Sequence, residues 1–146
     1  MIDRENAKVR LAAATDAKVV ATLVYELLAE LSGDPGSGSE LSEFEQLAGQ
    51  LLIPGSGIWG LLAERPGGEI LGVLMLNQCA SFYAGGPFGE VTEFYVSPGQ
   101  RGTGVGKLLM AAAVNFARER AWRRLEVGAP PTPQWQSTVD FYLRSG

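Results

Sequence analysis

Residues 91–113 read VTEFYVSPGQRGTGVGKLLMAAA, and this stretch decides the fold. It opens with β-branched and aromatic residues, which are typical of a strand, and Ser97-Pro98-Gly99 ends that strand because proline and glycine interrupt a ladder. A glycine-rich loop follows at 100–107, and apolar residues at helical spacing come directly after it. Such a loop exposes backbone N–H groups at the positive end of a helix, so the stretch predicts a site for a phosphate or pyrophosphate.

The spacing of the glycines excludes the two commonest nucleotide loops. A P-loop requires G-x-x-x-x-G-K-[ST]; Gly106 and Lys107 supply the G-K pair, but Arg101 stands where the first glycine is needed. The dinucleotide motif G-x-G-x-x-G fails as well, because its last position is a lysine when counted from Gly102 and a leucine when counted from Gly104.

The loop instead resembles a signature of the GCN5-related N-acetyltransferase (GNAT) superfamily. Residues 100–106 (QRGTGVG) match its Q/R-x-x-G-x-G/A pattern, and FYVSP at 94–98 resembles the strand that precedes the pattern. The resemblance implies an α/β fold with a mixed, mostly antiparallel sheet flanked by helices, and it implies acetyl-CoA as the cosubstrate. It places the coenzyme at Phe94, Tyr95, Val96, Arg101, Gly102, Thr103, Gly104, Val105, Gly106 and Lys107.

The same resemblance suggests a catalytic acid near the end of the sequence. Residues 141–146 (FYLRSG) resemble the superfamily's F-Y-x-x-x-G segment, whose tyrosine commonly faces the coenzyme sulfur, so Tyr142 is the candidate for protonating the leaving thiolate. Two positions upstream depart from the pattern, because Trp135 stands where asparagine is frequent and Thr138 where alanine is frequent.

Two glutamates are candidates for the base that takes the proton of an attacking amine. Glu90 and Glu93 lie on opposite faces of a regular strand, because their spacing is odd. The strand of the superfamily usually splays or bulges here, so periodicity does not choose between them. A base can act through a water molecule, which keeps both in consideration.

Composition limits the remaining possibilities. The chain of 146 residues is expected to form a single domain, and its net charge of −4 argues against nonspecific nucleic-acid binding, which depends on Lys and Arg. The sequence contains no histidine, which excludes Ser-His and Cys-His catalysis and His-based metal sites, so no metal is expected. Cys79 is the only cysteine, and no apolar run reaches about 18 residues, so we expect a cytoplasmic protein without a membrane span.

Periodicity and turn residues outside the central stretch predict the order β-α-α-β-β-β-α-β-α. Strands are expected at 9–13, 58–64, 70–79, 88–96 and 124–127, and helices at 19–31, from 39 or 42 to 52, at 105–120 and at 134–143. Thr15 or Asp16 suits the N-cap of the first helix. The superfamily normally adds one or two further strands after the last helix, so either the chain is truncated or a partner, such as a second copy, completes the sheet.

These observations favour an acetyl-CoA-dependent N-acetyltransferase that acts on a primary amine of a small molecule or peptide. The alternative is a catalytically inactive acyl-CoA-binding or sensing module of the same fold. Segments 33–57 and 81–88 are the candidates for acceptor selection. Phe82 and Tyr83 in the second segment either line an acceptor pocket or simply pack.

Overall fold

The structure, a computed structural model, describes residues 7–33 and 38–127 of the chain. The elements follow the predicted order as far as these residues reach, whereas the helix predicted at 134–143 lies outside them. The elements are β1 (Lys8–Leu11), α1 (Ala17–Ser32), α2 (Gly38–Leu51), β2 (Ile58–Glu64), β3 (Ile70–Ser81), β4 (Gly86–Val96), α3 (Val105–Glu119) and β5 (Leu125–Val127), with short 3-10 turns at Ala14–Asp16 and Pro98–Gln100.

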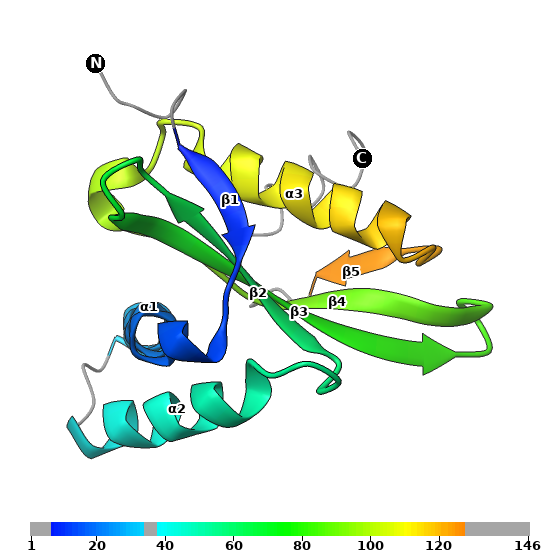
Figure 1. Ribbon diagram of the computed structural model, residues 1–146, viewed down its shortest axis with the longest axis horizontal. Coiled ribbons are helices and arrows are strands. Elements are labelled where there is room, and N and C mark those ends of the chain that lie inside the picture. Colours follow the sequence, from blue (N-terminus) through cyan, green and yellow to red (C-terminus); the bar gives the residue numbers. More distant parts are fainter. Residues whose placement is uncertain (1–6, 34–37, 128–146) are drawn as a thin grey trace.

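The strands form one mixed sheet in the order β1-β2-β3-β4-β5. Neighbours from β1 to β4 are antiparallel, and β5 runs parallel to β4. This is the arrangement predicted from the sequence, a mostly antiparallel mixed sheet flanked by helices. Figure 1 shows α3 on one side of the sheet and α1 with α2 on the other.

Strand β3 lies in the middle of the sheet because its sequence is apolar on both faces. Residues 71–76 are all buried. Leu74 packs in the cluster beneath α3, whereas Val73 and Met75 pack in the cluster beneath α1 and α2. A strand covered on both faces has this near-continuous apolar pattern, which explains why the run 70–79 predicts a central strand.

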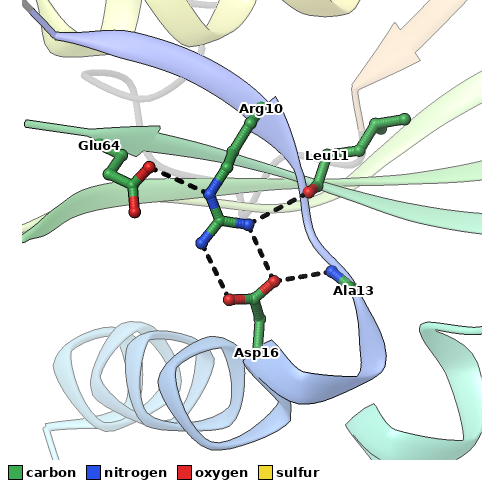
Figure 2. A network of polar contacts seen from close by, with 5 residues as sticks. All are labelled: Arg10, Leu11, Ala13, Asp16 and Glu64. Atoms are coloured by element: carbon green, nitrogen blue, oxygen red, sulfur yellow. Dashed lines mark hydrogen bonds and ion pairs between the residues drawn. The ribbon is translucent and has the colours of Figure 1, made fainter. Parts of the chain in front are cut away.

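A polar network joins β1 to the start of α1 (Figure 2). The guanidinium of Arg10 donates to both carboxylate oxygens of Asp16, each at 2.9 Å, and its Nε donates to Glu64 Oε1 at 3.1 Å. Asp16 also accepts the backbone N–H of Ala13 at 2.7 Å. Asp16, one of the two residues predicted as candidates, is the N-cap residue of α1, but its side chain makes no capping bond to that helix. The carboxylate is directed to Arg10 instead, a partner that local sequence does not indicate.

We expect Asp16→Asn to lower the free energy of unfolding at neutral pH by about 1 kcal/mol, since the variant loses a charge-assisted pair that is partly open to solvent. The hydrogen bond from Arg10 lowers the pKa of Asp16. A carboxyl whose pKa is depressed by folding stabilises the protein above its unfolded pKa, about 3.9, and that stability is lost as the pH falls through the folded pKa. Urea unfolding at pH 7 and near pH 3 should therefore give a difference between wild type and variant that shrinks in acid.

Glu45→Gln removes a carboxylate at an exposed position of α2 and serves as the control, with little expected change at either pH. A difference between wild type and Asp16→Asn that persists undiminished in acid would contradict the role given to the Arg10 pair.

Among residues 7–33 and 38–127, no helix is long and apolar enough to cross a membrane.

Candidate functional site

The glycine-rich loop connects β4 to α3 and depends on glycine at two positions. Gly102 and Gly104 have φ angles of 79° and 96°, in the left-handed region that residues with a Cβ rarely adopt. Gly104 is the N-cap of α3, and no side chain caps that helix. The first helical hydrogen bond runs from the Leu108 N–H to the Gly104 carbonyl at 3.0 Å, so helix geometry leaves the amides of Val105 and Gly106 without an acceptor inside the helix.

The electrostatics of this helix end favour an anion. The first turn of α3 contains no acidic residue, and Lys107 lies within it. The helix dipole adds partial positive charge at the same end. The Thr103 hydroxyl donates to the Gln100 carbonyl and thereby braces the loop. The loop predicted to bind a pyrophosphate therefore has suitable geometry and charge.

The side chain of Arg101 is 44% exposed but folds back on the protein. Its Nε donates to the Val96 carbonyl at 2.9 Å, and its Nη2 donates to Glu30 Oε2, also at 2.9 Å. The guanidinium carbon lies 5.2 Å from the centre of the Tyr95 ring. The hydrogen bond from Arg101 lowers the pKa of Glu30, while burial, followed by the charges of Glu30 and Glu26, raises the pKa of Tyr95. Sequence reasoning missed Glu30, which reads as an ordinary exposed residue of an amphipathic helix.

A bulge in β4 places the two candidate bases on one face of the sheet. Glu93 pairs with Met75 and Val91 with Leu76, so Thr92 is an extra residue without a counterpart in β3. Beyond the bulge, Glu90 pairs with Asn77. A regular strand would place Glu90 and Glu93 on opposite faces, but the bulge, a feature that the family resemblance suggests for this strand, puts them on the same face.

The face that these carboxylates share is the one covered by α1 and α2. The partners Met75 and Asn77 are two residues apart on β3 and thus point the same way, and Met75 packs in the cluster beneath those helices. Glu93 Oε1 accepts a hydrogen bond from the neighbouring Thr92 hydroxyl at 2.7 Å. Both glutamates are half-buried.

Strand β4 pairs with β3 along one edge and with β5 along the other. Among the described residues, Gly89 to Val91 pair with Leu125 to Val127. The Ser97 N–H donates to the Leu71 carbonyl of β3 at 3.0 Å. Because backbone groups alternate in direction along a strand, those of Phe94 and Val96 point to the opposite edge, the edge along which Gly89 to Val91 pair with β5.

Further polar groups gather beside Glu90. Glu126 is its neighbour across the parallel ladder, and Cys79 Sγ lies 4.0 Å from Glu90 Oε1. Burial, then the charges of Glu90 and Glu126, raises the pKa of Cys79. Glu126 Oε2 is held by the Tyr83 hydroxyl at 2.8 Å and by Arg124 Nε at 2.9 Å. Glu126 is thus already neutralised by a cation.

Phe82 and Tyr83, the two aromatic residues at the tip of the β3–β4 hairpin, differ in their contacts with the rest of the protein. The hairpin projects beyond the other strands (Figure 1). Phe82 at its tip is fully exposed, at 106% of its reference surface, so it lines no pocket among the described residues. Tyr83 packs against Phe88 with ring centres 5.8 Å apart and binds Glu126. Tyr83 therefore lies on the rim of the carboxylate-bearing face.

The contacts above do not bear on the predicted catalytic role of Tyr142 or on the expectation about a metal. Tyr142 lies outside the described residues. Within residues 7–33 and 38–127, no group of three or more His, Cys, Asp or Glu side chains could hold a metal ion.

The described residues therefore bring together a glycine-rich loop at a helix N-terminus, the strand that leads into this loop, and two carboxylates on one face of that strand. The loop and the strand are predicted from the sequence, whereas the shared face of the carboxylates results from the bulge. This combination suits a ligand with a phosphate-containing end and an extended arm that pairs with a strand, with proton transfer at the far end of the arm.

Comparison with known proteins places the chain in a family. The profile of the Acetyltransferase (GNAT) family matches residues 21–146. No curated protein sequence matches the chain.

Several solved structures share the fold. A putative acetyltransferase from Arthrobacter sp. FB24 is 28% identical with a TM-score of 0.73, and the match covers 94% of this chain and 83% of that one. The ribosomal-protein-alanine N-acetyltransferase of Brucella melitensis biovar Abortus 2308 is 22% identical with a TM-score of 0.71, over 92% of this chain and 89% of that one.

An aminoglycoside acetyltransferase from an uncultured soil metagenomic sample is 20% identical with a TM-score of 0.70, over 99% of this chain and 89% of that one. At these last two identities the likeness concerns the fold alone. The family profile spans most of the sequence, and together with the glycine-rich loop and the bulged strand it leads to one conclusion: the chain belongs to the GNAT acetyltransferase family.

Proposed function

We propose that the chain transfers the acetyl group of acetyl-CoA to a primary amine by direct attack of the amine on the thioester. One observation carries the proposal: β4 carries both glutamates on one face and leads into the glycine N-cap of α3. A single strand thus connects a diphosphate site to candidate bases. A cytoplasmic location is part of the proposal, in keeping with a single cysteine.

The coenzyme would lie along this strand. The diphosphate would accept hydrogen bonds from the amides of the loop and of the first turn of α3, in residues 101–107, with the charge of Lys107 nearby. The pantetheine arm would pair, as an additional strand, with the backbone edge formed by Phe94 and Val96. Tyr95 would contribute by holding Arg101, because its own side chain faces α1.

The reaction requires one base and one acid. The amine nitrogen attacks the thioester carbon, and the tetrahedral intermediate places its negative oxygen near a backbone N–H. The amine proton passes, through water, to the carboxylate pair Glu90 and Glu93. The carbon–sulfur bond then breaks, Tyr142 protonates the departing thiolate, and the products are the N-acetyl amide and free coenzyme A.

We expect Tyr142→Phe to lower kcat by about 10- to 100-fold and to leave KM for acetyl-CoA within about twofold, because the variant loses only the proton donor. Initial rates of coenzyme A release measure both constants. Tyr25→Phe is the matched control, since this tyrosine packs edge-on against Phe44 of α2 at 6.0 Å. An unchanged kcat in Tyr142→Phe would remove this tyrosine from the mechanism.

The first test of the proposal is ligand selectivity. Calorimetric titration should give micromolar binding of acetyl-CoA, with ATP and NAD binding at least about tenfold more weakly, because neither nucleotide motif fits the loop. Tighter binding of ATP would contradict the proposal.

The second test is turnover with a panel of amines. The panel contains polyamines, amino acids, aminoglycosides and peptides with a free N-terminus, of which the last two are prompted by the acceptors in the names of structural relatives. Coenzyme A release that depends on one of these amines supports the enzyme. Binding of acetyl-CoA without any such release would instead support the inactive binding or sensing module.

A further inference from the structure

The last turn of α1 is connected to the glycine-rich loop by the ion pair between Glu30 and Arg101. The atoms Nη2 and Oε2 are 2.9 Å apart. The Tyr95 hydroxyl approaches the same carboxylate oxygen at 3.4 Å, and the guanidinium lies over the Tyr95 ring. The remaining contact, from Arg101 Nε to the Val96 carbonyl, attaches the guanidinium to the end of β4. The Arg101 side chain is thus held by a helix and a strand at once.

Arg101 occupies a place in the loop where such an anchor matters. It follows the 3-10 turn Pro98–Gln100 and precedes Gly102, whose backbone adopts a positive φ. Glycines have no side chain with which to fix their own backbone. The backbone N–H of Arg101 makes only a long bond, 3.4 Å, to the Pro98 carbonyl. The side chain of Arg101 therefore helps to place this part of the loop.

The end of α1 also depends on the contact. The buried residues of this helix, Val20, Ala21 and Leu23, all lie in its first half. Leu28 and Leu31 in its second half are 41% and 50% exposed. A helix end with few buried apolar contacts is held less firmly than one that packs on the core. The polar bridge joins two segments that would otherwise be weakly restrained.

We propose that Glu30 is a positioning residue for the coenzyme site. By holding the planar guanidinium of Arg101 against Tyr95 and Val96, it keeps the loop amides in the arrangement that receives the diphosphate. The inference rests on the proposed function in one respect, namely that coenzyme A binds at this loop.

A simple charge effect predicts the opposite result, which makes the proposal testable. Coenzyme A is an anion, so removing a negative side chain near its site should tighten binding through electrostatics alone. If Glu30 acts by position, Glu30→Gln should instead weaken the binding of coenzyme A by about two- to fivefold, the range that a solvent-exposed ion pair contributes.

Glu26→Gln is the matched control. Glu26 is exposed, lies one turn earlier in α1, and is near enough for its charge to reach Tyr95. The control therefore removes the same charge from the same helix without breaking the bridge to Arg101. Calorimetric titration with coenzyme A at one ionic strength should show weaker binding in Glu30→Gln alone. Tighter binding in Glu30→Gln, or equal effects in the two variants, would overturn the proposal.

A double-mutant cycle and hydrogen exchange complete the experiment. In an Arg101→Lys background, Glu30→Gln should change the affinity by less than about twofold, because the planar contact is already lost. In the ligand-free protein, amides of residues 97–106 should exchange faster in Glu30→Gln than in Glu26→Gln. If the wild type bound no coenzyme A, the proposed function would fail, while equal exchange in the two variants would overturn the role of Glu30 separately.

Discussion

Replacing Gly104 by valine will reduce the affinity for acetyl-CoA by at least about tenfold. Gly104 has a φ of 96°, and a β-branched residue placed there costs roughly 1–2 kcal/mol or forces the backbone to change. A changed backbone would turn the first amides of α3 away from the diphosphate, and each hydrogen bond to a charged group contributes about 1.5–3 kcal/mol. Added side-chain atoms at the N-cap would also occupy space next to the anion.

Gly99→Val tests whether the effect belongs to this position. Gly99 lies in the same connection, has no positive φ, and a Cβ built on it meets no atom within 4 Å. Calorimetric titration of both variants with acetyl-CoA should therefore show near-normal affinity for Gly99→Val and a large loss for Gly104→Val, while circular dichroism verifies that both remain folded. Similar affinities for the two variants would mean that the diphosphate is bound elsewhere.

The double variant Glu90→Gln/Glu93→Gln will lower kcat by about 10²- to 10⁴-fold at neutral pH, the usual contribution of a general base. The bulge at Thr92 places both carboxylates on the face beneath α1 and α2, and a base in this position can act through a water molecule. Glutamine keeps the size of the side chain but cannot accept a proton. Binding of acetyl-CoA should change by less than about threefold, because neither residue belongs to the diphosphate loop.

Glu126→Gln provides the matched control for this variant. Glu126 carries a carboxylate next to Glu90 on the same sheet, but Arg124 and Tyr83 already hold it. Its replacement should lower kcat by less than about fivefold when coenzyme A release is measured with the responsive amine. The single variants Glu90→Gln and Glu93→Gln then show which carboxylate accounts for more of the loss in kcat. A double variant with wild-type kcat would show that neither carboxylate serves as the base.

Local chemistry was sufficient to predict the order of the elements in the described part of the chain and the position of the loop. Strand ends were marked by proline and glycine, as at residues 65–69, where the β2–β3 hairpin turns. The glycines at 102 and 104 have the positive φ angles that a Gly-rich loop suggests. These features depend on residues close together in the sequence, which is why periodicity and turn residues reveal them.

The interactions that shape the site in detail could not be predicted in this way. The family resemblance suggests a splay or bulge in this strand, but its position at Thr92 depends on the register between β3 and β4, and threonine is an ordinary strand residue. Glu30 and Arg101 are separated by 71 positions, so no local pattern connects them. Asp16 has the sequence features of a helix cap, yet Arg10 competes for its carboxylate. Each case depends on a tertiary contact.

Product analysis tests the central claim most directly. The purified chain is incubated with acetyl-CoA and each amine of the panel, and mass spectrometry together with a thiol assay follows the amine and the released coenzyme A. The account predicts that one class of amine becomes acetylated in equal amount to the coenzyme A released, and that Glu90→Gln/Glu93→Gln largely abolishes both. Binding of acetyl-CoA with no acetylated amine, and with coenzyme A release no faster than spontaneous hydrolysis, would contradict the account.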